Sequence, residues 1–203
     1  YFGIILMLIG ITLAFKCSLL SGLISIALTI AILTYDAYFK QFSFSGPLNM
    51  GICRGLNLLM GMSILGTLSH WYISIVPVVY IFAITLISRG EVHGNNKKHI
   101  VWAGILYAIV ILSIALVVMQ QKDNLIVLLP FLILFGFLIF KPLVKAFKEN
   151  SPSNIKKAVM SGVLSLVVMN ACWVAGFSDW YLALAVLLLL PLSMLLSKLF
   201  AVT

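Results

Sequence analysis

Residues 124–141 read NLIVLLPFLILFGFLIFK, and no side chain before the final lysine is charged. The hydrocarbon core of a bilayer is about 30 Å thick, and a helix of about 20 apolar residues crosses it. A backbone enters lipid only when its polar groups are hydrogen-bonded internally, so we expect this segment to be a transmembrane helix. The apolar residues do not alternate with polar ones, which argues against a strand of a membrane barrel.

Similar apolar runs fill the rest of the chain. Together they predict eight spans, at residues 1–15, 18–36, 49–66, 71–88, 100–119, 124–141, 157–177 and 180–199. Of the 203 residues, 63% are hydrophobic and 9% are charged, which leaves too little polar surface for a water-soluble globule. We therefore expect an all-α, polytopic transmembrane helical bundle that forms a single domain over residues 1–203.

The loops between the predicted spans carry most of the positive charge. When the loops are assigned to alternate sides of the membrane, ten of the 13 lysines and arginines fall on one side. The ten are Lys40, Arg89, Lys97, Lys98, Lys141, Lys145, Lys148, Lys156, Lys157 and Lys198. The positive-inside rule then predicts that loops 37–48, 89–99 and 142–156 are cytoplasmic. This topology and attraction to anionic headgroups account for the net charge of +8, so the lipid bilayer is an expected partner and nucleic acid is not.

One predicted span contains a charge. Residues 49–61 read NMGICRGLNLLMG, and Asn49, Cys53, Arg54 and Asn57 fall within about 140° of a helical wheel. An arginine within a span costs about 2.5–3.5 kcal/mol on insertion scales, so it persists where it faces a cavity or a partner. Snorkelling to the headgroups is the alternative, because Arg54 lies only about 8 Å along the axis from Asn49. The asparagines favour a water-filled pocket.

Small residues have packing roles in this interpretation. Gly51 and Gly55 are four residues apart, a spacing that lets two helix backbones approach closely. The cysteines form no CxxC pair and are interpreted as apolar packing residues; they are Cys17, Cys53 and Cys172.

Two polar segments follow predicted spans on the cytoplasmic side: TYDAYFK, residues 34–40, and SRGEVHGNNKK, residues 88–98. The candidate site residues are Tyr35, Asp36 and Lys40 in the first segment and Arg89 and Glu91 in the second. Cations and amides bind phosphate oxygens, and carboxylates hold a Mg²⁺ ion that the phosphates complete. Since only five residues are acidic, these two carboxylates among many cations favour a site for a phosphorylated ligand. The alternative for Glu91 is a solvated loop acid.

Three segments, TYDAYFK, GPLNMGICRGLNLLMGMS and YIFAITLISRGEVHG, resemble the UbiA superfamily of intramembrane prenyltransferases. They cover about residues 34–94, and the resemblance is closest to the UbiA-like branch encoded in bacterial ebo gene clusters. The resemblance implies a helical bundle around a cavity that opens to the cytoplasm. It also implies two aspartate-rich motifs that hold Mg²⁺ and a prenyl diphosphate, and a location in the bacterial inner (plasma) membrane.

The match to the family motifs is partial. Segment SRGEVHG falls where the second aspartate-rich motif belongs, with Glu91 as one carboxylate and Asn95 in the place of the usual aspartate. The first motif is absent, and the chain starts at Tyr1 inside an apolar run. We interpret the sequence as an N-terminally truncated chain that lacks two spans.

Three functions remain open at this stage. The first is Mg²⁺-assisted transfer of a prenyl group from a prenyl diphosphate to a small or aromatic acceptor. The diphosphate would then contact Arg54, Asn49, Asn57, Tyr35, Lys40 and Arg89, the metal would contact Glu91 and Asp36, and no residue is assigned as catalytic. The second is a non-catalytic protein that binds or helps transport an isoprenoid-like molecule. The third is a generic transporter or scaffold, for which Asn170 is the main candidate residue. The oligomeric state is left open.

Overall fold

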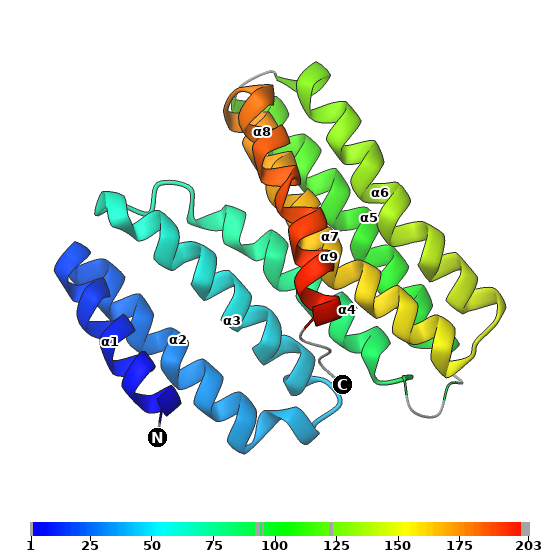
Figure 1. Cartoon of the computed structure of the whole chain (residues 1–203), viewed down its shortest axis with the longest axis horizontal. Helices are drawn as coiled ribbons and strands as arrows, with labels where there is room; N and C mark the ends of the chain where they lie inside the picture. Colours follow the sequence, from blue (N-terminus) through cyan, green and yellow to red (C-terminus); the bar gives the residue numbers. More distant parts are fainter. Residues whose placement is uncertain (1, 92–93, 95, 122–123, 200–203) are drawn as a thin grey trace. The chain divides into compact units, whose positions relative to one another are not determined.

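The computed structural model describes residues 2–91, 94, 96–121 and 124–199, and every regular element in this part of the chain is helical (Figure 1). The helical part of the fold prediction is therefore confirmed. Packing divides the chain into two compact units, Tyr1–Thr85 and Leu86–Thr203, which are described separately below. That the two form one domain stays a prediction.

The first unit is a series of helices joined by short turns. It contains α1 (Phe2–Cys17), α2 (Leu19–Ala37), the 3-10 turn η1 (Phe39–Gln41), α3 (Ser45–Met62), η2 (Ser63–Leu65), η3 (Trp71–Ser74) and most of α4 (Ile75–Ser88). Ser18 ends α1 and caps α2, because its side chain accepts a hydrogen bond from the amide of Ser21. Helix α2 packs against α1 on one side and α3 on the other.

The predicted close approach at Gly51 and Gly55 is confirmed, and the partner is the segment from η3 into α4. A Cβ atom added to Gly51 would lie 2.5 Å from the carbonyl oxygen of Val78. One added to Gly55 would lie 2.5 Å from a methyl group of Val78 and 3.1 Å from the carbonyl oxygen of Ser74. Only glycine permits this separation between the two backbones.

The second unit contains the remaining five helices. After the end of α4 come α5 (Lys97–Gln121), α6 (Leu125–Lys148), α7 (Pro152–Phe177), α8 (Trp180–Leu187) and α9 (Leu189–Leu199). Helices α6 and α7 form a long antiparallel pair, and α8 and α9 run back along α7 (Figure 1). The hydroxyl of Ser161 on α7 donates to the carbonyl of Leu138 on α6 over 2.8 Å, which fixes the register of that pair.

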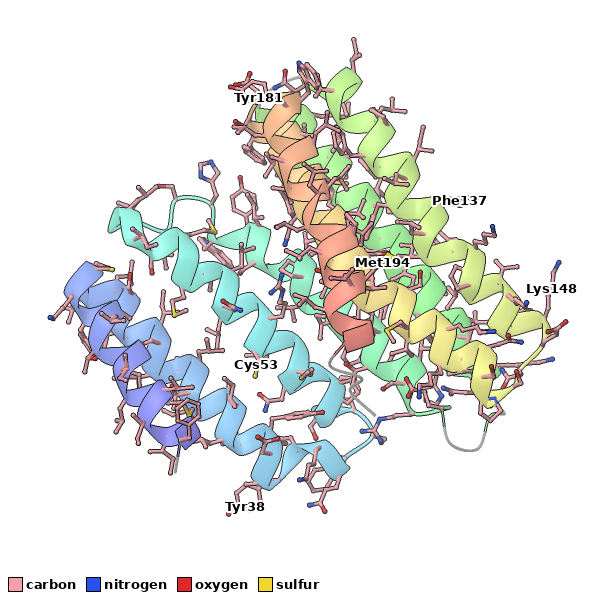
Figure 2. All side chains as sticks on the ribbon, in the orientation of Figure 1. Tyr38, Cys53, Phe137, Lys148, Tyr181 and Met194 are labelled. Carbon is pink, nitrogen blue, oxygen red and sulfur yellow. The ribbon has the colours of Figure 1, made fainter. Side chains whose placement is uncertain are left out.

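The core of the second unit comes from residues at three- and four-residue spacing on one face of each long helix. They include Tyr107, Val110, Ile114 and Val118 on α5, and Leu128, Phe131, Phe135 and Ile139 on α6. The opposite face of α6 is equally apolar but exposed, since Ile126, Ile133 and Phe137 expose 88%, 63% and 58% of their surface. Figure 2 labels Phe137 on this face. Such a surface is stable against lipid and not against water.

Two loops meet at one end of the second unit. The backbone amide of Asn96 donates to Oδ1 of Asn150 over 3.0 Å, so the segment before α5 lies beside the α6–α7 turn. The side-chain amide of Asn96 also donates to the carbonyls of Leu86 and Ile87 at the end of α4. The predicted loop 142–156 is wrong in extent, because α6 continues through Pro142 to Lys148 and α7 begins at Pro152.

The predicted count of eight spans is also wrong. In the described part of the chain, six helical segments are long and apolar enough to cross a membrane, and they have the length and composition of an integral membrane protein. They are Leu19–Ala37, Ser45–Leu65, Trp71–Ser88, Lys97–Gln120, Leu125–Lys148 and Pro152–Phe177. The 16 described residues of α1 are a shorter apolar helix, and the last predicted span is broken into α8 and α9. Pro191 explains the break, because its ring would clash with the carbonyl of Leu187 in a continuous helix.

With six spans in place of eight, the three loops that were predicted to be cytoplasmic still share one side of the membrane. If each of the six segments crosses the membrane, residues 38–44, 89–96 and 149–151 still fall on one side. The assignment of that side to the cytoplasm stays a prediction that rests on the positive-inside rule.

Candidate functional site

Arg54 lies deeper in its helix than the sequence predicts. Helix α3 begins at Ser45, not at the predicted residue 49, so Arg54 is nine residues, or about 14 Å, from its start. The candidate span runs from Ser45 to Leu65, which places Arg54 at its middle. Its side chain is half-buried. The greater depth weakens the snorkelling alternative, since the guanidinium is far from both ends of the helix.

The hydrogen-bonding environment of Arg54 is considered within the described part of the first unit. Among the described residues of the first unit, none forms a hydrogen bond or an ion pair with it. A positive charge held in the middle of an apolar helix without an anion is costly. The residue therefore has free hydrogen-bonding capacity for an anionic group.

Asn49 has a structural partner. Its side chain is buried, and Nδ2 donates to the carbonyl of Ala31 on α2 over 2.9 Å. The amide thus ties α3 to α2 through an interhelical hydrogen bond. Its Oδ1 atom can still accept a bond, and the predicted contact of Asn49 with a diphosphate stays a prediction.

Asn57 belongs to a different part of the unit from the TYDAYFK end. It lines a pocket of about 270 Å³ between α1, α2 and α3, together with Gly10, Leu13, Ala14, Cys17, Ser21, Met60, Gly61 and Ile64. This pocket lies where α1 ends and α2 begins, whereas Tyr35 and Asp36 lie where α2 ends. The structure therefore separates Asn57 from Tyr35 and Asp36, whereas Arg54 is one turn before Asn57 on α3.

Three further candidates lie at and just after the end of α2. Tyr35 is half-buried, and Asp36 and Lys40 are exposed in the last turn of α2 and in η1. The bond between Asn49 and Ala31 aligns α3 with α2, so Asp36, five residues after Ala31, lies towards the start of α3. Arg54 lies five residues after Asn49, further along α3. Cys53 is labelled in Figure 2.

Arg89 and Glu91 belong to the second unit, in the turn that follows α4. Arg89 is exposed and Glu91 half-buried, and the amide of Glu91 donates to the carbonyl of Ser88 over 3.0 Å. His93 and Asn95 from the same predicted motif lie outside the described residues. The eight predicted site residues therefore fall into two sets, one in each unit.

A metal ion in a protein is held by several ligating side chains that lie close together. Within residues 2–91, 94, 96–121 and 124–199, no group of three or more His, Cys, Asp or Glu side chains lies together. Asp36 and Glu91 are the two carboxylates assigned to Mg²⁺, and they are in different units. Neither unit by itself therefore supplies both of these carboxylates.

Sequence reasoning missed a larger pocket in the second unit. Its volume is about 450 Å³, within the range of small-molecule sites in proteins. Its lining comes from α6, α7 and α9: Leu138, Ser153, Lys156, Lys157, Met160, Ser161, Leu164, Ser165, Leu190 and Met194. A signal was present, because the α7 residues form two adjacent rows at four-residue spacing. The two lysines were interpreted only as topology signals.

Comparison of the chain with protein-family models, curated proteins and solved structures finds no match. The resemblance to the UbiA superfamily therefore stays a prediction.

Proposed function

We propose that this chain is an integral membrane protein that binds a molecule with an anionic head group and an apolar, isoprenoid-like tail. The observation that carries the proposal is the half-buried Arg54 at the middle of a candidate span, without an anionic partner among the described residues of its unit. A charge in this position is retained when a ligand or a cavity compensates its cost.

The residues around Arg54 suit a phosphate-containing head group. A guanidinium binds phosphate oxygens through two parallel hydrogen bonds, which a lysine cannot reproduce. Tyr35 and Lys40 at the end of α2 supply a further hydroxyl and a further cation near the polar end of the unit. The apolar surfaces of α2 and α3 would accept the tail, since Ile30, Leu33 and Ile52 are exposed there.

The binding test uses the full chain in lipid nanodiscs and a labelled prenyl diphosphate. Arg54→Gln removes the charge, and loss of a charged hydrogen bond costs about 1.5–3 kcal/mol, so affinity should fall at least about tenfold. Lys16→Gln is the matched control, because Lys16 is an exposed cation of the same unit at the end of α1. Equal affinities of the two variants would contradict the proposal.

Prenyl transfer is the second candidate function, favoured by the Asp36 carboxylate at the end of α2, the helix that packs against α3 and its Arg54. In this proposal the donor is a prenyl diphosphate and the acceptor a small or aromatic molecule. Arg54 and Lys40 would hold the departing diphosphate, and fixed cations would stabilise its growing charge. Asp36 and Glu91 are the carboxylates to which Mg²⁺ would be assigned, with Arg89 near the second.

Turnover separates the two functions. The full chain is incubated with prenyl diphosphate and candidate aromatic acceptors, and pyrophosphate release is measured with and without Mg²⁺. Release that depends on Mg²⁺ and is lost in Asp36→Asn supports the transferase. Ligand binding without release supports the binding protein alone.

A further inference from the structure

The pocket of about 450 Å³ in the second unit has two chemically different ends. Ser153, Lys156 and Lys157 line one end, in the first two turns of α7. Leu164, Leu190 and Met194 line the other end, where α9 lies along α7. A cationic mouth that leads into an apolar groove matches an amphiphile with a negative head. Figure 2 labels Met194 on α9.

The length of the groove matches one leaflet of a bilayer. The part of α7 that lines the groove extends from Ser153 to Ser165. This separation of twelve residues corresponds to about 18 Å along the helix axis. Half of the hydrocarbon core measures about 15 Å, and the headgroup layer lies beyond it. A lipid that keeps its headgroup at the membrane surface would therefore place one acyl chain along this whole groove.

The charge at the mouth favours an anionic headgroup. Both lysines are exposed, and the described lining includes no acidic side chain. The nearest acid along the chain, Glu149, does not line the groove, and its Oε2 atom accepts a hydrogen bond of 3.1 Å from Nδ2 of Asn154. Lysines beside the membrane surface attract anionic lipid.

We propose that this groove is a binding site for one anionic phospholipid, with its phosphate on Lys156 and Lys157 and one acyl chain between α7 and α9. Ser161 contributes little polarity to the groove, because its hydroxyl already donates to the carbonyl of Leu138. Met160 and Leu164 then form the apolar wall. This site lies in the second unit and does not depend on the function proposed for Arg54.

The test measures binding of phosphatidylglycerol to the purified full chain by native mass spectrometry, with phosphatidylcholine as the neutral comparison. Each lysine near a membrane surface contributes about a fivefold preference for anionic lipid, so Lys156→Gln/Lys157→Gln should lower phosphatidylglycerol affinity about 25-fold. Phosphatidylcholine binding should not change. The matched control is Lys145→Gln/Lys148→Gln, which removes the same charge from exposed residues at the end of α6 that do not line the groove.

A second pair of variants tests the apolar wall. Met160→Trp should block the groove and lower lipid retention at least about fivefold. Val163→Trp is its control, because Met160 and Val163 are each 47% exposed on α7 but only Met160 lines the groove. Loss in Met160→Trp alone supports the site, whereas equal behaviour of the two tryptophan variants overturns it.

Other occupants give distinct results, each of which overturns the proposal. If inorganic phosphate displaces the bound lipid with the same potency as a competing phospholipid, the groove is a simple anion site. Preference for farnesyl phosphate over phosphatidylglycerol would assign the groove to an isoprenoid phosphate. A lipid-free dimer that Met160→Trp dissociates would indicate a second copy of the chain. Arg54→Gln should leave phosphatidylglycerol binding unchanged, which separates this result from failure of the proposed function.

Discussion

Nδ2 of Asn49 donates a hydrogen bond of 2.9 Å to the carbonyl oxygen of Ala31, and this bond joins α3 to α2 inside the first unit. The bond sets the rotation of α3, so that Asn49 faces α2 while Gly51 and Gly55 face the chain between η3 and α4. Arg54 lies between these two faces on the helical wheel. The packing of α3 therefore fixes the direction in which the charged side chain of Arg54 leaves the helix.

Asn49→Ala should destabilise the protein by about 1 kcal/mol, because interhelical hydrogen bonds in membranes contribute about 0.6–1.7 kcal/mol. Unfolding of the full chain by dodecyl sulfate in bicelles measures the change. Asn57→Ala is the control, since its side chain is exposed and its removal should alter stability little. Equal destabilisation by both substitutions would contradict the structural role of Asn49.

Gly51→Ala should destabilise the first unit by at least about 1–3 kcal/mol, the usual cost of overpacking. The added methyl group would meet the carbonyl oxygen of Val78 at 2.5 Å, and backbone cannot move aside as a side chain can. Gly61→Ala on the same helix meets nothing within 4 Å and should leave stability unchanged or raise it by up to about 1 kcal/mol. The same unfolding assay compares them, and a loss of stability of equal size in both would refute the close contact.

Asn96→Ala should loosen the end of α4 and the segment before α5. It removes the side-chain donor to the carbonyls of Leu86 and Ile87 at a buried position, at a cost of about 1–3 kcal/mol. Hydrogen exchange of the amides around Gly90 should rise at least about fivefold. Lys98→Ala, a substitution of an exposed residue two positions later, should not change the exchange. Unchanged exchange in Asn96→Ala would refute the role of these hydrogen bonds in holding the end of α4.

Arg54→Lys should weaken prenyl diphosphate binding by less than Arg54→Gln does. The substitution keeps the charge but loses the two parallel hydrogen bonds of the guanidinium. Affinity measured in the nanodisc assay should then lie between those of the parent chain and Arg54→Gln. Full affinity in Arg54→Lys would mean that only charge matters, and an affinity as low as that of Arg54→Gln would make geometry decisive.

The sequence alone predicts the interiors of the helices well and their ends poorly. Apolar length identifies α5 and α6, but the predicted end at Lys141 ignores that a helix can continue through Pro142 with lysines in its last turns. The span predicted from apolar length starts at residue 49, after Gly46 and Pro47. Proline is tolerated in the first turn of a helix, and α3 begins at Ser45.

The contacts of the candidate site residues could not be predicted from the sequence for a different reason. The pattern around Arg54 indicates a polar face, but the partner of Asn49 is a backbone carbonyl 18 residues earlier, which no local pattern specifies. The groove in the second unit has the same origin, because Lys156 and Met160 become its lining only when α9 lies along α7. Contacts between segments that are distant in the sequence depend on tertiary packing, so the periodicity of apolar residues does not predict them.

The position of Arg54 halfway along α3 has an electrical consequence. An energised membrane places about 2.3 kcal/mol on each elementary charge that crosses 100 mV, and a group that reaches the middle experiences about half of it. An anionic head group that enters from the negative side towards Arg54 moves down this gradient. The affinity for the proposed ligand should then increase about sevenfold per unit of charge at 100 mV, so a membrane potential of this sign would favour binding and depolarisation would weaken it.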